Sequence, residues 1–545
     1  MLSRILLWAS LVWIPVGPQS DRPVRFPTFP NFSCDRQMAY CNRTIEAGLR
    51  TVKRYGRGAA FVDVNSDGWD DLFLADTDDG WEPQKRGMSM FFINRKDGTF
   101  EPTSAADLGI DNRDLKSTWN GSFADYDNDG DPDLLLANGG YTGKSSLALY
   151  KNRIPEGLFF VSATDLSGIG IANAAPSEWW GSSWADYDRD SYLDVVVTRN
   201  NGTPLIFHNN GDGTFELANV SLGVTIIMQD GKNPVWLDYD MDGDPDLYIA
   251  GMNQHAFYRN DGGTKFTDIT KQIFPEPLPV PEGWTYGPIP IVFAAVAADF
   301  NQDGLDDLFL GRWSLQNVVL INDGKGNFKR HATDWGLVTS LDDRTESAAY
   351  ENTMGLAVGD LFDDGYPDVL IGTGQPSRAA PDIVFCNKGG VSFSRCTDKI
   401  LTGADQIWRT RGHGMVFSDF DHDGDTDFVI NLGGHPDYDI LEGRISPEWP
   451  ALYVNQRGAS GNMATLTLVG TASNRDAIGA RIRVDGSAVH HYVVRSMQGF
   501  QSQSSKNQVV NLGSSTTGKV EIRWPSGRVQ SLDVKAGDRI TVTEP

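Results

Sequence analysis

The sequence predicts an all-β protein built from seven copies of one unit, and three observations support this prediction. Glycine is abundant, with 58 residues in a chain of 545, which is typical of chains with many tight turns. An acidic nine-residue pattern recurs seven times, with successive copies between 52 and 62 residues apart. Short apolar runs separated by glycine-containing turns follow each copy, as expected of β-strands joined by hairpins.

Each repeat contains four predicted strands. An apolar run leads into the acidic pattern, a second run leaves it, and a third run ends in asparagine, as in Phe91 to Asn94 and Phe207 to Asn209. A turn such as Asp97-Gly98-Thr99 and a further strand complete the repeat. Four-stranded units arranged radially form a β-propeller, so seven repeats predict seven blades over residues 26–456.

The seventh repeat lacks a fourth strand, because the chain changes character after Leu452 to Asn455. The N-terminal stretch Phe32 to Leu49 ends like the fourth strands of other repeats, such as the one that ends at Gly109-Ile110. We therefore expect an N-terminal strand to complete the last blade and close the ring, since an open edge would be left without it.

The acidic pattern has the same register in all seven copies, which we number as acidic loops 1 to 7 with positions 1 to 9. Asp or Asn stands at positions 1, 3, 5 and 9 in nearly every copy, and glycine usually stands at position 6. The candidate metal ligands are Asp63, Asn65, Asp67 and Asp71; Asp125, Asp127, Asp129 and Asp133; Asp186, Asp188, Asp190 and Asp194; Asp238, Asp240, Asp242 and Asp246; Asp299, Asn301, Asp303 and Asp307; Asp360, Asp364 and Asp368; and Asp419, Asp421, Asp423 and Asp427.

These loops have the chemistry of a calcium site. Hard cations prefer six to eight oxygen ligands, and carboxylates spaced along a tight loop converge when glycine permits the turn. Ordinary hairpin turns explain one or two such loops but not seven in one register. We expect up to seven Ca²⁺ ions, with the sites at 186–194 and 360–368 weakest, because Ser191 replaces glycine in one and Phe362 removes an oxygen from the other.

The charge balance agrees with cation binding. The chain has 72 acidic and 47 basic residues, a net charge of -25, and 40% hydrophobic residues. An acidic excess of this size repels phosphate groups, which argues against nucleic-acid binding and docking on anionic lipid. The hydrophobic content and length are sufficient for the cores of several domains.

The first twenty residues have the features of a secretory signal peptide. Arg4 precedes an apolar run from Ile5 to Val16, which is too short to span a bilayer. Pro18 and Gln19 stand where small residues are expected before a cleavage site, so a retained anchor or a buried strand remains an alternative. We expect residues 1–20 to be a signal peptide, a secreted or extracytoplasmic protein, and no membrane span.

The four cysteines form two local pairs, Cys34 with Cys41 and Cys386 with Cys396. The second pair brackets the turn sequence Asn387 to Gly390, so a hairpin could bring its sulfurs within bridging distance. Two disulfides fit an oxidising compartment, and unpaired buried thiols are the alternative.

N-glycosylation sequons make a glycoprotein another expectation, if the protein passes through a eukaryotic secretory pathway. They occur at Asn31, Asn42, Asn120, Asn201 and Asn219.

The repeats resemble a known family. Their form, D-x-[DN]-x-D-G-x-x-D followed by apolar strands, is similar to the FG-GAP or VCBS repeats of integrin α-subunit propellers. Gly470 to Arg481, Ser502-Gln503 and Val520 to Gln530 resemble the ASPIC/UnbV domain, although Val510-Asn511-Leu512-Gly513 stands where a Phe-Gly-Leu-Gly segment is usual. The chain thus resembles the cartilage acidic protein family, which implies a secreted, calcium-loaded propeller followed by a small β-rich domain. Alternating short strands over residues 463–545 agree with such a domain.

One further set of residues is placed by the repeat. Six residues before the first Asp of each loop, near the start of each innermost strand, stand Arg57, Trp119, Trp180, Lys232, Phe293, Met354 and His413. We call them the channel ring, because equivalent positions surround one mouth of the propeller channel. They predict a ligand pocket in which His413 acts as acid or base and Arg57 or Lys232 holds an anionic group. The alternative is that these side chains only fill the channel.

Two functions remain open from the sequence. The first is a secreted calcium-binding interaction module, expected to be a monomer, that recognises a protein or glycan. The second is a calcium-stabilised enzyme that uses the channel mouth on a small-molecule substrate, such as a secondary metabolite in a cyclase or isomerase reaction, or on a polysaccharide. The zinc-protease H-E-x-x-H and the nucleophile elbow G-x-S-x-G are absent from the sequence, so it leaves open whether the protein is an enzyme.

Overall fold

The computed structural model describes residues 39–51, 56–77, 88–104, 107–115, 117–139, 146–154, 157, 159–174, 177–252, 254–278, 292–313, 315–337, 353–373, 382–401, 412–433, 449–457 and 462–545. All described residues belong to one compact unit, Arg36–Pro545. The predicted signal peptide, Cys34 and the Asn31 sequon lie outside the described residues.

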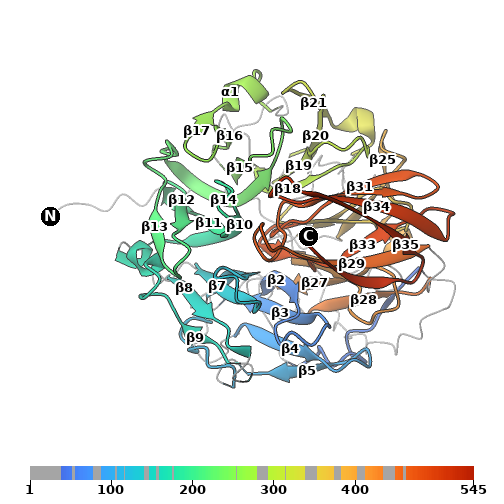
Figure 1. Ribbon diagram of the computed structural model, residues 1–545, viewed down its shortest axis with the longest axis horizontal. Coiled ribbons are helices and arrows are strands. Elements are labelled where there is room, and N and C mark those ends of the chain that lie inside the picture. Colours follow the sequence, from blue (N-terminus) through green and yellow to red (C-terminus); the bar gives the residue numbers. More distant parts are fainter. Residues whose placement is uncertain are drawn as a thin grey trace, which may run out of the picture. The chain divides into compact units, whose positions relative to one another are not determined.

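Seven four-stranded antiparallel blades form the propeller, as predicted (Figure 1). Blades 1 to 3 consist of β2 (Gly56–Val62), β3 (Asp71–Asp76), β4 (Met90–Asn94) and β5 (Phe100–Thr103); β6 (Thr118–Ala124), β7 (Asp133–Asn138), β8 (Leu147–Lys151) and β9 (Val161–Ser162); and β10 (Trp179–Ala185), β11 (Asp194–Gly202), β12 (Leu205–Asn209) and β13 (Phe215–Leu217). A 3₁₀ helix, η2 (Ile169–Ala174), follows β9.

The remaining blades repeat this order. Blades 4 to 6 consist of β14 (Met228–Leu237), β15 (Asp246–Gly251), β16 (Ala256–Asn260) and β17 (Phe266–Asp268); β18 (Val292–Ala298), β19 (Asp307–Arg312), β20 (Val318–Asn322) and β21 (Phe328–His331); and β22 (Gly355–Gly359), β23 (Asp368–Gly372), β24 (Ile383–Asn387) and β25 (Phe393–Arg395). Three single-turn helices, α1 (Thr270–Ile273), η3 (Thr333–Trp335) and α2 (Thr397–Ile400), follow the outer strands of these blades.

The seventh blade is closed by the N-terminal strand, which confirms the prediction. It contains β26 (Gly412–Ser418), β27 (Asp427–Leu432) and β28 (Ala451–Asn455), and β1 (Tyr40–Asn42) pairs with β28 in antiparallel register. Tyr40 lies opposite Asn455, and its side chain is fully buried. The ring therefore joins strands that are more than 400 residues apart.

The innermost strands are buried on both faces, and small residues allow adjacent blades to approach. Every residue of β2, β6 and β10 is buried. A Cβ atom on Gly121 would lie 2.3 Å from the Phe73 ring of the neighbouring blade, so only glycine fits there. Apolar side chains from the first three strands fill the space between blades, as in the cluster of Phe73, Phe91 and Phe123.

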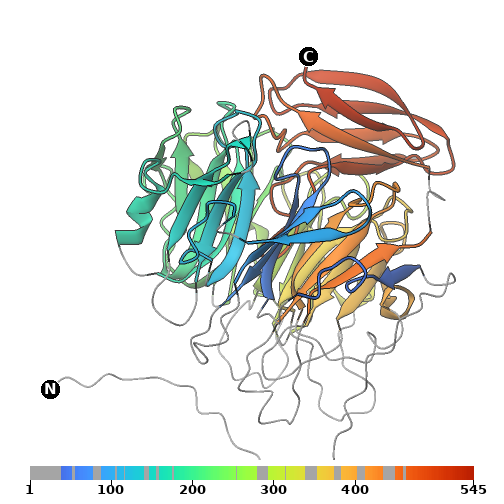
Figure 2. The same ribbon diagram turned by 90° about the horizontal axis from the view of Figure 1, so that it is seen from below.

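The C-terminal domain consists of two small sheets. They contain β29 (Met463–Val469), β33 (Gln508–Asn511) and β36 (Arg539–Thr543), and β30 (Arg481–Asp485), β31 (Val489–Val493), β34 (Thr517–Arg523) and β35 (Val529–Lys535). Figure 2 shows this domain on one side of the propeller. Its core around Ile482 and Trp524 belongs to the same hydrophobic cluster as Trp184 and Phe215 of blade 3.

A disulfide joins Cys386 and Cys396 across the β24–β25 hairpin, with Cα atoms 5.9 Å apart, as predicted. Cys41 is also disulfide-bonded, and its predicted partner Cys34 lies outside the described residues.

Two of the five sequons are buried. Asn120 is fully buried and its Oδ1 accepts a hydrogen bond from the Ser182 backbone N–H at 3.2 Å, and Asn219 is 4% exposed. Burial at these two positions disfavours a glycan there in the folded protein, and glycosylation at the other sequons stays a prediction.

Candidate metal centres and the central channel

The seven acidic loops adopt one backbone frame. In acidic loop 1, the Asp63 carboxylate accepts hydrogen bonds from the N–H groups of Asp67 at 2.9 Å and Gly68 at 2.7 Å. The same pair of bonds reaches the position-1 carboxylates Asp125, Asp186, Asp299 and Asp360. The carboxylate of the first aspartate thus stabilises the turn by accepting hydrogen bonds within the loop, which the sequence spacing alone could not show.

Positions 4 and 6 of every loop have a left-handed backbone conformation. Position 4 has a φ between 53° and 62° in all seven loops, at Ser66, Asn128, Arg189, Met241, Gln302, Asp363 and His422. Position 6 is glycine at positive φ except in acidic loop 3, where Ser191 has a φ of 80°. Ser191 keeps the turn and its N–H still bonds Asp186 at 3.0 Å, but a side chain at this φ is strained.

The position-9 aspartate connects each loop to the third strand of its own blade. In acidic loop 5, one Asp307 oxygen accepts the Phe300 N–H at 2.9 Å and the other accepts the Asn322 N–H at 2.7 Å. The bond from the asparagine N–H to the position-9 aspartate recurs in all seven blades.

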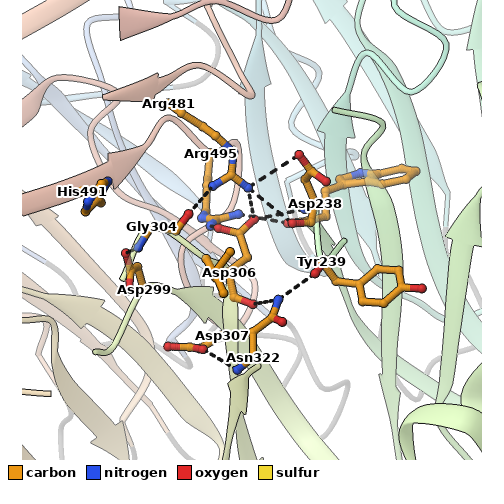
Figure 3. A network of polar contacts seen from close by, with 12 residues as sticks. Asp238, Tyr239, Asp299, Gly304, Asp306, Asp307, Asn322, Arg481, His491 and Arg495 are labelled. Carbon is orange, nitrogen blue, oxygen red and sulfur yellow. Dashed lines mark hydrogen bonds and ion pairs between the residues drawn. The ribbon is translucent and has the colours of Figure 1, made fainter. Parts of the chain in front are cut away.

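The side chain of this asparagine links neighbouring blades. The Nδ2 atom of Asn322 donates to the Tyr239 carbonyl of the preceding blade's loop at 2.7 Å and to the Asp306 carbonyl of its own loop at 3.2 Å (Figure 3). The corresponding pairs in the other blades are Asn94 with Phe420, Asn152 with Val64, Asn209 with Tyr126, Asn260 with Tyr187 and Asn387 with Phe300. The sequence showed the recurring asparagine, but not its role as an inter-blade link.

The carboxylates of the loops fit a bound cation. Burial raises the pKa of Asp246 to about 9 and the pKa of Asp71 to about 8, so a neighbouring positive charge is needed to keep them ionised at neutral pH. The Oδ1 atoms of Asp127 and Asp188 and the Oδ2 atom of Asp427 are buried and have no hydrogen-bond donor among the described residues. Oxygen-only donor sets with unsatisfied lone pairs are what Ca²⁺ requires.

Four loops bring three or more ligand atoms within 4.8 Å of one another. These are acidic loops 2, 3, 4 and 7, through Asp125, Asp127 and Asp133; Asp186, Asp188 and Asp190; Asp238, Asp240 and Asp246; and Asp419, Asp421 and Asp423. They are the four loops in which all four ligand positions are Asp. Acidic loops 1 and 5 share the frame and carry Asn at position 3.

Side-chain cations lie close to some loops. In acidic loop 6, where Phe362 replaces a ligand, the Arg457 guanidinium lies 4.6 Å from the Phe362 ring centre and 3.6 Å from Asp363. In acidic loop 2, the Lys151 ammonium contacts Asp127 and lies 3.0 Å from Asp129. Lys151 thus contacts two candidate ligands of its loop, whereas Arg457 contacts Asp363 at position 4, which is not a candidate ligand.

The C-terminal domain covers the loop face of the propeller through arginine–aspartate pairs. Arg539 reaches Asp419 at 2.7 Å, and Arg475 lies 3.7 Å from Asp125. Arg481 and Arg495 both pair with Asp306, at 3.0 and 2.7 Å (Figure 3).

The Asp306 carboxylate is 1% exposed. Burial acts to raise its pKa, but the Arg481 and Arg495 charges lower it below the ordinary value. Arg481 also lies 3.7 Å from Asp238, a predicted ligand in acidic loop 4. The same residue therefore helps to hold the C-terminal domain against the propeller and lies beside a loop carboxylate.

The structure places the seven channel-ring residues at equivalent points of the blades, and all seven are buried. In six blades the innermost strand has a register shift at this point. Arg57 lies 4.5 Å from the Trp119 ring centre, and the Trp119 and Trp180 rings lie 4.2 Å apart. The Lys232 ammonium lies 2.9 Å from the Trp180 ring centre and 2.7 Å from Asp230, and burial lowers its pKa to about 8.

The remaining ring residues continue this packing. Phe293 lies 5.2 Å from the Lys232 ammonium, Met354 is 9% exposed and His413 is 1% exposed. The geometry brings a cation and aromatic rings together, and they contact one another. The catalytic roles suggested for His413, Arg57 and Lys232 stay predictions.

A segment of the C-terminal domain enters the channel from the loop face. In this segment, which we define as residues 496–505 and call the channel segment, Ser502 and Gln503 form β32 (Ser502–Gln503), which pairs in parallel with β2. The Gln503 side chain bonds both backbone groups of Phe123, at 2.7 and 2.9 Å. Phe500 is fully buried and its ring lies 4.9 Å from Phe293 of the channel ring. Nothing in the local sequence of this segment indicated that it would leave its own domain.

Comparisons with known proteins agree with these features. The family model described as FG-GAP-like repeat matches residues 63–136, 125–197, 186–249 and 299–371. The family model described as ASPIC and UnbV matches residues 470–545. The chain is therefore a β-propeller protein of FG-GAP-like repeats with a C-terminal ASPIC and UnbV domain.

Its relatives include cartilage acidic protein 1. The human protein is 22% identical over 360 residues, which are 65% of this chain and 42% of the human protein. The Xenopus tropicalis protein is 27% identical over 202 residues, which are 36% of this chain and 29% of that protein. The chain thus spans less than half the length of the curated relatives that it matches.

Solved structures show weaker similarity. An Agrocybe aegerita lectin that recognises non-reducing terminal N-acetylglucosamine is 20% identical, with a TM-score of 0.40, covering 63% of this chain and 79% of the lectin. The periplasmic gluconolactonase of Pseudomonas aeruginosa is 11% identical, with a TM-score of 0.38, covering 62% of this chain and 84% of the enzyme. Scores this low support no inference about ligand or reaction. Within the described residues, no helix has the length and apolar character needed to cross a membrane.

Proposed function

We propose that the protein is a calcium-binding β-propeller interaction module. The observation that carries this proposal is the shared frame of the seven acidic loops, with buried carboxylate oxygens at Asp127 and Asp427 that have no hydrogen-bond donor among the described residues. A bound Ca²⁺ would supply the positive charge that these oxygens lack. The ligands would be the side-chain oxygens at positions 1, 3, 5 and 9, of which acidic loop 6 lacks the one at position 3.

Calcium would act on the surface where the two domains meet. Arg481 and Arg539 contact the position-1 aspartates Asp238 and Asp419, so cations in these loops would adjust the charge that the C-terminal domain faces. Cation binding would thereby stiffen the loop face and fix the docked domain. A stiff scaffold is suited to presenting a constant surface to a protein or glycan.

The alternative of an enzyme at the channel mouth has less support. The seven channel-ring side chains are buried against one another, and the channel segment fills the channel from the other side. We therefore propose that the outer surface of the propeller recognises the protein or glycan. Substitution of His413 and Arg57 tests this, because an enzyme of the channel mouth would lose turnover while remaining folded.

The Cys386–Cys396 disulfide supports an extracytoplasmic location, since structural disulfides persist mainly in oxidising compartments. We propose that the protein works outside the cytoplasm, where calcium near millimolar concentration fills even weak sites.

The test is a melting curve with bound calcium measured by mass spectrometry, before and after exhaustive chelation. We expect several Ca²⁺ ions per chain and a fall in melting temperature when they are removed. Asp246→Asn should remove one ion, whereas the control Asp268→Asn, at the exposed end of β17, should remove none. An unchanged melting temperature and no bound calcium would contradict the proposal.

A further inference from the structure

Acidic loop 3 differs from the others in that an imidazole nitrogen lies among its carboxylates. Nδ1 of His208 lies 3.1 Å from Oδ1 of Asp194 and 3.3 Å from Oδ2 of Asp188. Of the acidic clusters found among the described residues, this is the one that includes a nitrogen ligand. The local sequence gave no sign of this contact, because His208 lies fourteen residues after Asp194 in a different strand.

The fold holds His208 in this position. The residue precedes Asn209 at the end of β12, and Asn209 is fixed to Asp194 through its N–H at 2.8 Å. The Tyr187 ring meets the imidazole edge-on, with ring centres 6.0 Å apart. The side chain is only 20% exposed, so Nδ1 faces the loop as a result of the strand register and this packing.

A hydrogen bond to Asp194 alone does not account for the imidazole. The two Asp194 oxygens already accept backbone N–H groups from Asn209 at 2.8 Å and Tyr187 at 3.1 Å, as the position-9 aspartates of other blades do without a histidine. The Oδ1 atom of Asp188 is buried and has no donor among the described residues. The cluster therefore has both a nitrogen ligand and an oxygen whose lone pairs are unused.

The ligand spacing suits a small transition-metal ion. Around a tetrahedral Zn²⁺, with bonds of roughly 2.0–2.2 Å, adjacent ligand atoms lie roughly 3.3–3.6 Å apart. The observed separations of 3.1 and 3.3 Å lie slightly below and at the lower end of this range. Calcium prefers oxygen ligands at longer distances, whereas imidazole and carboxylate together favour zinc and related ions.

We propose that acidic loop 3 binds a divalent transition metal of the zinc class, and not calcium, through Asp188, Asp194 and Nδ1 of His208. A carboxylate oxygen of Asp186 or Asp190 is available as a fourth ligand, because one oxygen of each belongs with Asp188 to a second cluster within 4.8 Å. The inference rests on the proposed function in one respect, since it takes the acidic loops to be cation sites.

The competing explanation is that a protonated His208 itself serves as the cation of this loop. The hydrogen bond to Asp194 raises the pKa of His208 to about 9. A metal ion must then displace this proton, as it does when it binds any histidine or thiolate ligand. The two explanations differ in whether the loop takes up a metal, which can be measured directly.

The experiment uses the full chain, dialysed first against a chelator and then against buffer with 1 mM CaCl₂ and a small molar excess of ZnCl₂, followed by measurement of both metals. We expect one Zn²⁺ per chain. His208→Gln should lose that zinc and take up one additional Ca²⁺ instead. His331→Gln is the matched control, because His331 forms a 2.6 Å pair with Asp334 and is in no cluster of three ligands among the described residues.

Cobalt gives a second readout. Replacement of Zn²⁺ by Co²⁺ should produce the visible absorption of a four-coordinate site with a nitrogen ligand, and His208→Gln should abolish it. Circular dichroism of each variant shows whether the propeller remains folded, and the calcium count of the other loops tests the proposed function separately. Uptake of Ca²⁺ in place of Zn²⁺ by the unaltered chain, zinc that survives His208→Gln, or no metal in this loop would each overturn the inference.

Discussion

The Tyr40 hydroxyl lies 3.3 Å from the carbonyl oxygen of Leu361. In each of the other six blades, an asparagine side chain from the third strand donates to the equivalent carbonyl group of the preceding loop. The Tyr40 hydroxyl also lies 2.9 Å from the Thr426 carbonyl, and Asn455 donates to the hydroxyl at 3.4 Å. The closing strand thus supplies the seventh inter-blade link with a tyrosine.

Tyr40→Phe should weaken ring closure. The change removes the one hydroxyl proton that the buried carbonyl groups of Leu361 and Thr426 share, which costs about 1–3 kcal/mol. We expect a lower free energy of unfolding in urea. Tyr192→Phe is the control, because the Tyr192 hydroxyl makes no hydrogen bond among the described residues. Equal stability of the two variants would show that the Tyr40 hydroxyl does not contribute to closure.

Asp306→Asn should loosen the C-terminal domain. The substitution leaves Arg481 and Arg495 partly buried without their shared carboxylate, and breaking a buried ion pair in this way costs about 3–5 kcal/mol. We expect faster hydrogen exchange in the channel segment. Asp485→Asn, which disrupts the exposed Arg483–Asp485 pair, should have almost no effect. Unchanged exchange in Asp306→Asn would contradict a role in docking.

Phe500→Ala should also separate the domains, through lost packing. The ring is fully buried against Phe293, and truncation of such a side chain typically costs about 3–5 kcal/mol. A two-step melting curve in calorimetry is the expected result, with the propeller melting last. The exposed Val529→Ala in the same domain serves as the control. A single transition at the original temperature would show that the channel segment adds little.

The stability of the chelated protein should fall as the pH rises from about 5 to about 8. Burial raises the pKa of Asp71 to about 8 and that of Asp299 to about 7, so at intermediate pH the folded protein binds more protons than the unfolded chain and loses stability as they dissociate. Calcium needs the ionised carboxylates, so the calcium-dependent rise in melting temperature should be larger at pH 8 than at pH 5. Melting curves at both pH values, with calcium and with chelator, measure this difference.

Much of the fold follows from local patterns in the sequence. The spacing of Asp, Gly and apolar residues was sufficient to predict seven blades, because each blade is a set of hairpins whose contacts are close in sequence. The missing fourth strand of the last blade was enough to place the N-terminal strand beside β28. The candidate ligands such as Asp238 and Asp246 were found for the same reason, since a tight loop brings nearby residues together.

Other features depended on the tertiary structure. The link from Asn322 to Tyr239 joins residues 83 positions apart, and the pair of Arg495 with Asp306 joins residues 189 apart. The side chain of His208 enters the third loop from another strand, although no motif relates it to Asp188. No local pattern encodes such contacts, because they depend on how blades and domains pack.

By itself, the sequence determined the repeat, the strands and the acidic loops, because these are set by short-range spacing and turn chemistry. The tertiary structure decided which side chains face those loops, what fills the channel and where the C-terminal domain docks. These outcomes depend on the packing of surfaces that are distant in the chain, and burial then fixes the charges and hydrogen bonds of the residues brought together.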